Sequence, residues 1–183
     1  MAGWIISGII VLVLVFVVFI YNRLVRQRNR VLEGWSGIDV QLKRRHDLIP
    51  NLVSTVKGYA RHEEGVLSKV TELRNSAVKA QATGEKSAIE TALTQQLRQL
   101  FALAEAYPDL KANQNFLDLQ NKLSEIEEQL QLARRYYNGT VRDMNILVQS
   151  FPSNFIADSF GFKETEFFEI ELATQREVPE VSF

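Results

Sequence analysis

The chain has 183 residues, a formal net charge of −1 at pH 7 and no cysteine. The near-neutral charge provides no general attraction to nucleic acid, and the lack of cysteine excludes disulfide bonds, thiolate metal sites and a cysteine nucleophile. The length suffices for one domain with its own hydrophobic core beside a membrane segment.

The first element is an apolar run at the N-terminus. Residues 4–21 have the sequence WIISGIIVLVLVFVVFIY, without one charged side chain. About 20 residues of helix span roughly 30 Å, the thickness of the hydrocarbon core of a bilayer. Because arginines follow this run and no cation precedes it, the pattern favours a retained membrane helix over a cleaved signal peptide. We therefore predict a transmembrane anchor over residues 1–21.

The residues that flank the apolar run predict its orientation. Trp4 and Tyr21 lie at its two ends, where amphipathic rings favour the headgroup level. Four cations follow the run, namely Arg23, Arg26, Arg28 and Arg30. Because positive residues beside a span stay in the cytoplasm, we expect the N-terminus outside and residues 22–151 as a cytoplasmic helical bundle.

An amphipathic stripe begins directly after the arginines, with no flexible linker between. Apolar residues recur at steps of three, four or seven from Val31 to Ala77, and His46 fills one gap in phase with them. This pattern predicts a long helix continuous with the membrane span. Pro50 lies inside the pattern and is expected to bend or split the helix, since proline lacks an N–H group and clashes with the preceding turn.

The pattern leaves the end of this first soluble helix open. Gly58 and Gly65 each weaken a helix by roughly 1 kcal/mol relative to alanine. A break between them would divide the stripe into two helices, so three and four long helices both remain open. The stripe as a whole is expected to end near Ala82, where a Thr-Gly pair follows.

The next helix is predicted from a capping box. Ser87 is the expected N-cap, with Glu90 three residues later. The apolar face then continues to Tyr107, and Pro108 is expected to stop the helix.

The third soluble pattern is the most regular. Apolar residues alternate at steps of three and four from Phe116 to Phe151, which predicts a helix of about 36 residues, or roughly 54 Å. The single irregularity coincides with Asn138 and Gly139. A bend or the close approach of another backbone is the preferred interpretation, and a polar site that lines a cavity is the alternative.

Residues 152–183 form a tail of different composition. Seven of the chain's eleven phenylalanines lie from residue 151 onward, whereas a disordered tail is typically poor in aromatic residues. We expect this acidic tail to dock on its own bundle or on a neighbouring subunit, at least as far as Leu172. The candidate contact residues are Phe151, Phe155, Phe160, Phe162, Phe167 and Phe168.

The sequence contains no motif that assembles a catalytic centre. It has no H-E-x-x-H, no G-x-S-x-G, no glycine-rich phosphate loop and no aspartate-rich calcium loop. The two histidines, His46 and His62, would lie about 24 Å apart along one helix, too far to share a metal ion. We therefore predict no enzymatic activity, no cofactor and no metal site.

Two polar segments are candidates for binding. Residues 42–53 (LKRRHDLIPNLV) favour a solvated helix face with a kink, and the alternative is a surface for lipid phosphates or for an acidic segment such as the tail. This candidate interaction surface comprises Lys43, Arg44, Arg45, His46 and Asp47. His46 is more typical of a hydrogen-bonded core histidine than of a pH switch. Residues 134–145 (RRYYNGTVRDMN) favour a buried polar layer over an interface anchor.

Several blocks, in this order, resemble the LemA family of bacterial membrane proteins. They are MAGWII, VQLKRRHDLIPNLVSTVKGYARHE, LFALAEAYPDLKAN, ARRYYNGTVRDMN and FPSNFIADSFGFKETEFFEI. The resemblance implies a helical bundle on one N-terminal membrane helix, with the N-terminus outside. It implies no established activity, cofactor or catalytic residue. It also implies an accessory role in the cell envelope, for which membrane protein quality control is a candidate.

The combined prediction is an all-α protein with a single N-terminal transmembrane helix, an up-and-down bundle of three to four long helices and a phenylalanine-rich tail. We expect a non-enzymatic scaffold or adaptor in the bacterial cytoplasmic (inner) membrane that self-associates through its helices and tail. Its expected partners are the lipid bilayer, further copies of itself and another membrane protein, and no nucleic acid. The alternatives are a regulatory partner of a membrane enzyme such as a quality-control protease, and an unrecognised enzyme or lipid-binding protein.

Overall fold

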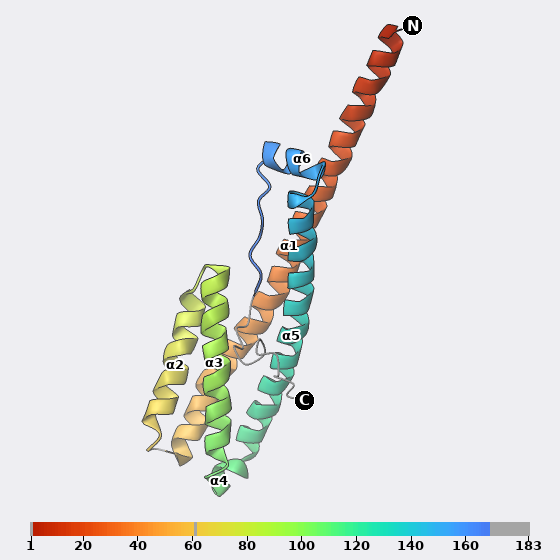
Figure 1. Ribbon diagram of the computed structural model, residues 1–183. Coiled ribbons are helices and arrows are strands. Elements are labelled where there is room, and N and C mark those ends of the chain that lie inside the picture. Colours follow the sequence, from red (N-terminus) through yellow and green to blue (C-terminus); the bar gives the residue numbers. More distant parts are fainter. Residues whose placement is uncertain (1, 61, 169–183) are drawn as a thin grey trace, which may run out of the picture. The chain divides into compact units, whose positions relative to one another are not determined.

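The computed structural model describes residues 2–60 and 62–168, and all regular secondary structure in this part of the chain is helical (Figure 1). This confirms the predicted all-α fold. The elements are α1 (Ala2–Tyr59), α2 (Glu64–Lys79), α3 (Thr83–Ala104), α4 (Pro108–Lys111), α5 (Gln114–Gln149) and α6 (Ser153–Ser159).

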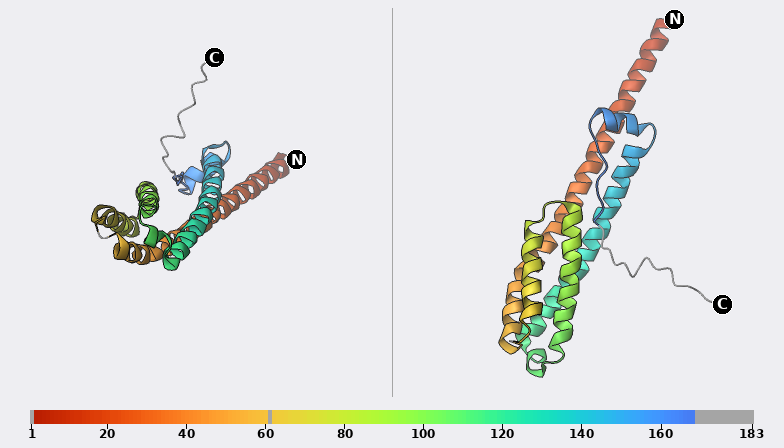
Figure 2. Two further views of the ribbon diagram at one scale, coloured as in Figure 1. Left: turned by 90° about the horizontal axis from the view of Figure 1, so that it is seen from below. Right: turned by 60° about the vertical axis from the view of Figure 1, so that its left-hand side comes forward.

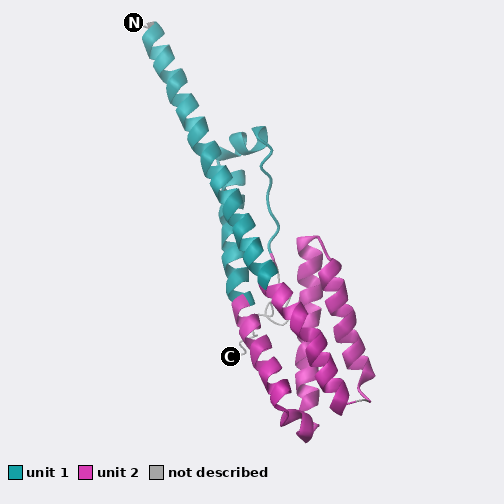
Figure 3. Cartoon of the chain, turned by 180° about the vertical axis from the view of Figure 1, so that it is seen from behind, with its two compact units in different colours: residues 1–40, 130–167 teal, residues 41–129, 168–183 magenta. Residues whose placement is uncertain are grey.

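The chain divides into two compact units (Figure 3). Unit 1 comprises residues 1–40 and 130–167, and unit 2 comprises residues 41–129 and 168–183. The two long helices α1 and α5 each contribute residues to both units.

Helix α1 is unbroken over 58 residues, which confirms that the apolar run continues into the bundle without a linker. Pro50 lies inside α1 and does not end it. Among the described residues, α1 is the one helix long and apolar enough to cross a membrane, and only 6% of its most apolar stretch is buried. A core helix of a soluble protein would be mostly buried, so this exposure fits a lipid-facing span.

In unit 2, helices α1, α2, α3 and α5 pack as an up-and-down bundle, with α2 and α3 side by side (Figure 2). The helix pattern breaks between Tyr59 and Glu64, which decides for four long helices rather than three. Gly58 and Gly65 lie next to the two ends of this break, where the helix is intrinsically weakest. Two side-chain hydrogen bonds hold the connection: Asn113 Nδ2 donates to Tyr59 Oη at 2.9 Å, and Tyr107 Oη donates to Glu63 Oε1 at 3.1 Å.

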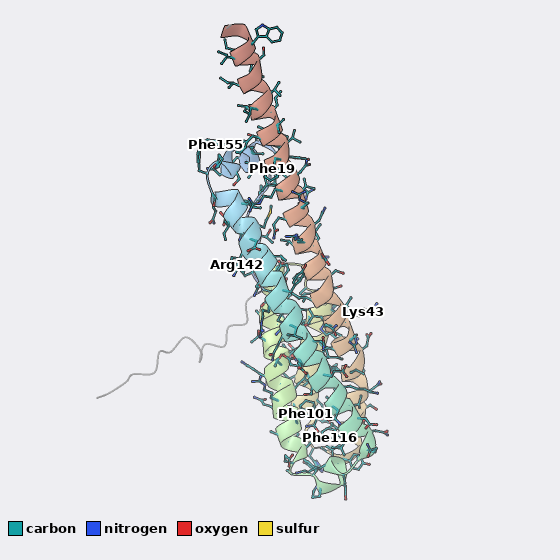
Figure 4. All side chains as sticks on the ribbon, turned by 90° about the vertical axis from the view of Figure 1, so that its right-hand side faces the viewer. Phe19, Lys43, Phe101, Phe116, Arg142 and Phe155 are labelled. Carbon is teal, nitrogen blue, oxygen red and sulfur yellow. The ribbon has the colours of Figure 1, made fainter. Side chains whose placement is uncertain are left out.

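The core of unit 2 is built from the inward faces of these helices. Its buried members are apolar, and all but Leu52 and Leu110 belong to the predicted stripes. They are Ile49, Leu52, Val56, Ala60, Leu67, Val70, Leu93, Leu97, Leu100, Ala104, Leu110, Phe116 and Leu123. Phe101 of α3 packs edge-on against Phe116 of α5, with ring centroids 6.1 Å apart (Figure 4). The stripes therefore pointed correctly to the buried face of each helix.

The predicted capping box of the second soluble helix is wrong. Helix α3 begins at Thr83, with Ala82 in the N-cap position and no side-chain cap. Ser87 and Glu90 lie inside α3 and are buried. Residues three apart share one helix face, so the Ser-x-x-Glu spacing here places both side chains toward the bundle instead of at a helix end.

The ends of the other helices lie close to their predicted positions. Helix α3 ends at Ala104, and Pro108 occupies the first turn of α4, a position that suits proline because the first N–H groups of a helix have no intrahelical partner. Helix α5 has the predicted length of 36 residues and runs from Gln114 to Gln149.

In unit 1, α1 and α5 run antiparallel and approach each other closely at Gly34. A Cβ atom at Gly34 would lie 3.1 Å from Tyr137 Cα, and the ring of Trp35 lies 5.5 Å from that of Tyr137. Further along, Gln27 Nε2 donates a hydrogen bond of 2.9 Å to the Thr140 carbonyl oxygen. The close backbone approach predicted at Gly139 is wrong, since nothing lies within 4 Å of a Cβ atom there.

Residues 152–167 of the tail belong to unit 1 and pack against its helices. Asn145 of α5 holds the extended segment after α6 with two hydrogen bonds: its Nδ2 donates to the Thr165 carbonyl oxygen at 3.0 Å, and its Oδ1 accepts from the Thr165 N–H at 2.9 Å. Tyr137 Oη donates to the Glu166 carbonyl oxygen at 2.9 Å. The part of the tail from residue 169 to 183, including Leu172, lies outside the described residues.

Gly161 makes the turn that sends the chain from α6 into this extended segment. Its φ of 72° lies in the left-handed region, and the Phe162 N–H donates to the Ala157 carbonyl oxygen at 2.9 Å. The Gly161 N–H donates to the Asp158 carbonyl oxygen at 3.3 Å, which completes a Schellman motif. Only glycine adopts this conformation without cost.

We expect Gly161→Ala to destabilise this turn by about 1–2 kcal/mol, because an L-residue is strained in the left-handed region. Accelerated amide hydrogen exchange at residues 160–166 would reveal the loss, while exchange in α3 stays unchanged. The matched control is Gly3→Ala, at a position where nothing lies within 4 Å of a new Cβ atom and φ is not positive. Equal exchange in both variants would contradict the role of Gly161.

Candidate functional site

A buried cluster of charged side chains links three helices of unit 2. Arg45 Nη1 of α1 lies 3.5 Å from Glu90 Oε2 of α3 and 3.3 Å from Glu127 Oε2 of α5. Arg45 Nη2 donates to Thr94 Oγ1 at 2.8 Å. His46 Nε2 lies 2.6 Å from Glu90 Oε1. Each oxygen of the Glu90 carboxylate is therefore used by a different residue of α1.

Burial makes this cluster energetically important. Glu90 is 0% exposed, Arg45 is 3% exposed and His46 is 6% exposed. A buried charge is tolerated only when it is paired and hydrogen-bonded, since removal from water costs several kcal/mol per ion. The main chain at His46 is held as well, because Arg74 Nε of α2 donates to its carbonyl oxygen at 3.2 Å. Each of the four long helices thus contributes at least one polar side chain to this part of unit 2. Such contacts are suited to fixing the register of the helices.

Over residues 2–60 and 62–168, no group of three or more histidine, aspartate and glutamate side chains is placed to hold a metal ion. His62 is exposed, in contrast to the buried His46.

The residues of the candidate interaction surface predicted at 43–47 do not all lie at the surface. Lys43, Arg44 and Asp47 are exposed, whereas Arg45 and His46 are buried and cannot belong to an exposed surface. His46 is a hydrogen-bonded core histidine, as the sequence favoured.

The burial of Arg45 has a signal in the sequence. An apolar stripe does not reveal it, because arginine is not counted among the apolar residues. Residue 45 lies three positions after Leu42 and four before Ile49, so it is in phase with the buried face. Its carboxylate partners come from α3 and α5, and periodicity within one helix carries no information about them.

A second polar contact closes the end of the unit 2 bundle. The hydrogen bond from Tyr107 to Glu63, assisted by partial burial, raises the pKa of the Tyr107 hydroxyl above its ordinary value. The neutral hydroxyl is thereby retained as a donor to the start of α2.

Residues 134–145 behave as a buried polar layer along one face of α5. Arg134, Tyr137 and Thr140 are buried, while Arg135 and Tyr136 are exposed. The preferred interpretation of this segment therefore agrees with the observed burial. The hydrogen bonds that Tyr137 and Asn145 make to the tail backbone have no signature in the sequence.

The described tail phenylalanines fall into two groups. Phe162 and Phe168 are buried, at 6% and 1% exposed. Phe162 packs within unit 1 against Tyr21, with ring centroids 5.9 Å apart, and the Arg28 guanidinium carbon lies 5.3 Å from its ring centroid. The more exposed group comprises Phe151, Phe155, Phe160 and Phe167.

Three of the exposed phenylalanines of unit 1, Phe151, Phe155 and Phe160, lie in or beside α6. The rings of Phe151 and Phe155 meet at 6.0 Å, and the ring of Phe160 lies 4.8 Å from that of Tyr21. Tyr21 ends the apolar run of α1, so α6 lies beside the end of the candidate membrane span (Figure 4).

A groove in unit 1 lies between α1 and α5 at the arginine-flanked end of the apolar run. Its volume is about 680 Å³. Three arginines, three apolar residues and two further polar residues line it, namely Phe19, Arg23, Arg26, Gln27, Arg30, Asp143, Ile146 and Leu147. We call it the arginine groove.

The sequence model of the LemA family matches residues 34–183. The chain belongs to the LemA family. The match includes the buried charge cluster and the tail, and it begins after the three arginines of the groove.

Curated relatives agree with this family membership. Magnetosome protein MamQ 2 of Paramagnetospirillum magneticum is 25% identical over 178 residues, which cover 81% of this chain and 64% of that protein. Magnetosome protein MamQ of Magnetospirillum gryphiswaldense is 24% identical over 174 residues, with the same coverage. Protein LemA of Metamycoplasma hominis is 28% identical over 156 residues, which cover 81% of this chain and 68% of that protein. The LemA-family chain thus spans less than two thirds of the length of the MamQ proteins.

Proposed function

We propose that this LemA-family chain is a non-enzymatic, membrane-anchored scaffold or adaptor of the bacterial cell envelope, and that it self-associates through its helices and tail. The observation that supports this most is the exposure of phenylalanines in and beside α6. Phe151 is 80% exposed, Phe155 is 63% exposed and Phe160 is 57% exposed. Burying such a side chain is worth about 1.5–3 kcal/mol, so a cluster of them favours a contact outside this single chain.

Unit 1 also carries apolar side chains on its helices that the described chain covers only in part. On α5 these are Leu132, Tyr136 and Ile146, each about half exposed. On α1, Leu32 is 61% exposed and Val40 is 53% exposed. These positions extend the apolar surface of unit 1 beyond α6 and provide helix faces for a second copy.

The proposed location is the bacterial cytoplasmic membrane, with the N-terminus outside and most of the chain in the cytoplasm. The arginines that follow the apolar run support this orientation. Because the chain has no cysteine, Lys43→Cys introduces one thiol at an exposed position. We expect a membrane-impermeant maleimide to label it only after the cells are permeabilised, and labelling in intact cells would contradict the orientation.

Self-association is tested with the full chain in mild detergent, by light scattering coupled to size exclusion. The wild type is expected to exceed the mass of one 20.9 kDa chain, after correction for bound detergent. The double variant Phe151→Ser, Phe155→Ser should shift the equilibrium toward the monomer. Substitution is preferable to truncation here, because removal of the tail would also remove the buried Phe162.

The control for this experiment is Val78→Ser on α2 in unit 2, which removes an exposed apolar side chain from another surface. It should leave the assembly intact. A wild-type chain that is monomeric at every concentration would refute self-association. A double variant that assembles like the wild type would refute the role of α6.

A further inference from the structure

We propose that the arginine groove binds the phosphate headgroup of an anionic phospholipid from the membrane leaflet that faces the arginines. This inference rests on the membrane anchorage put forward above, and it adds a specific lipid site to it. The groove is a property of unit 1 alone, since all of its lining residues belong to that unit.

The cations of the groove share one face of α1. Arg23, Arg26 and Arg30 are spaced by three and four residues, which places them in one row along the helix. Within the described ranges, none of these three guanidinium groups forms an ion pair with a carboxylate. Guanidinium groups bind phosphate oxygens through paired hydrogen bonds, so unpaired arginines in one row favour a phosphate ligand.

The wall of the groove formed by α5 carries one negatively charged residue. Asp143 of α5 is the one carboxylate in the lining, and it is 3.3 Å from Arg142 Nη2. Three cations therefore face one carboxylate that already has a cationic neighbour. The fourth arginine of the N-terminal segment, Arg28, is absent from the lining and lies over the Phe162 ring.

The position of the arginines matches the depth of lipid headgroups. On a helix that rises 1.5 Å per residue, Arg23 lies about 3 Å and Arg26 about 7.5 Å beyond Tyr21, the end of the apolar run. The headgroup layer of one leaflet is roughly 5–8 Å thick. Arg30 lies about 13.5 Å beyond Tyr21, and its long side chain can extend back toward the interface.

The apolar walls favour a lipid over a small phosphate ion. Phe19 belongs to the membrane run, and Ile146 and Leu147 line the α5 side of the groove. The Gln27 side chain is held by its hydrogen bond to the Thr140 carbonyl oxygen, so it forms a fixed part of the lining. The volume of about 680 Å³ exceeds that of a phosphate group and suits a headgroup with its glycerol.

The experiment measures phospholipids that stay bound to the delipidated full chain in detergent, by native mass spectrometry. The probes are phosphatidylglycerol and phosphatidylcholine added in equal amounts. The groove variant is Arg23→Gln, Arg26→Gln, Arg30→Gln. The control Lys57→Gln, Lys79→Gln, Lys122→Gln removes the same charge from exposed positions of unit 2, outside both the groove and the candidate interaction surface at residues 43–47. Circular dichroism verifies that both variants keep the helix content of the wild type.

We expect the wild type and the control to prefer phosphatidylglycerol, and the groove variant to lose about 10- to 100-fold of that binding. Equal losses in both variants would show general charge attraction and would overturn the site. Displacement of the lipid by glycerol 3-phosphate at similar concentration would show a site for free phosphate, and would overturn the lipid assignment.

A separate measurement distinguishes failure of this inference from failure of the membrane anchorage. Alkaline extraction of cell membranes tests whether the full chain stays in the bilayer. A chain that is extracted would refute the anchorage. A chain that stays in the bilayer but shows no preference for phosphatidylglycerol would refute only the lipid site.

Discussion

Glu90→Ala is expected to lower the free energy of unfolding by about 3–5 kcal/mol, the usual cost of breaking a buried ion pair by removal of one partner. Glu90 is 0% exposed, and its carboxylate contacts both Arg45 and His46. Two carboxylates contact the Arg45 guanidinium, those of Glu90 and Glu127. Without Glu90, the contact with the partly exposed Glu127 remains. Urea unfolding of the full chain in detergent, followed by circular dichroism, measures the loss.

Two further variants test this explanation of the Glu90 effect. Glu125→Ala removes an exposed carboxylate from α5 and should change stability by less than about 0.5 kcal/mol. Combining Glu90→Ala with Arg45→Met should recover part of the loss, because the uncompensated buried cation is then gone. A double variant that loses the full sum of the two single effects would contradict the proposed coupling.

Gly34→Leu is expected to destabilise unit 1 by about 1–3 kcal/mol through overpacking. Even the first added carbon would lie 3.1 Å from Tyr137 Cα, 3.4 Å from Thr140 Oγ1 and 3.4 Å from Tyr136 Cδ1. The backbone of Tyr137 cannot rotate away as the end of a flexible side chain would, so α1 and α5 must separate locally. This cost exceeds the gain of roughly 0.8–1 kcal/mol in helix propensity when glycine is replaced.

The fluorescence of Trp35 is a local probe for this effect, since its ring packs on Tyr137. Replacing the other tryptophan by Trp4→Phe leaves Trp35 as the single reporter. Gly34→Leu should shift its emission toward that of a water-exposed indole and lower the urea midpoint.

The matched control for Gly34 is the same substitution at Gly139 on α5. Nothing lies within 4 Å of a Cβ atom there, so Gly139→Leu should stabilise the helix by up to about 1 kcal/mol. If the two leucine variants had the same effect, the close approach at Gly34 would be refuted.

The comparison of these two glycines shows where local sequence patterns stop being informative. Gly139 interrupts the apolar stripe of its helix, and Gly34 does not. A stripe records which side of a helix is buried, but the distance between two backbones depends on both helices. The sequence therefore indicated the wrong glycine for close packing, although it assigned both to helices correctly.

The charge cluster shows the same limit for polar residues. Arg45 and Glu90 are 45 positions apart, and each has a plausible local explanation: a solvated cation beside Lys43 and Arg44, and the last residue of a capping box with Ser87. Both explanations are wrong because these side chains face each other across the bundle. Partners on different helices leave no periodic signal in either segment.

The sequence by itself determined the membrane-length apolar run, its continuation into a soluble helix, the 36-residue helix near the C-terminus and the inward faces of the bundle. These features follow from hydrophobicity and helical period, which act over neighbouring residues. Only the tertiary structure decided the pairing of Arg45 and His46 with Glu90, the contact at Gly34 and the arginine groove of unit 1. Each of these depends on the register between helices that lie far apart along the chain.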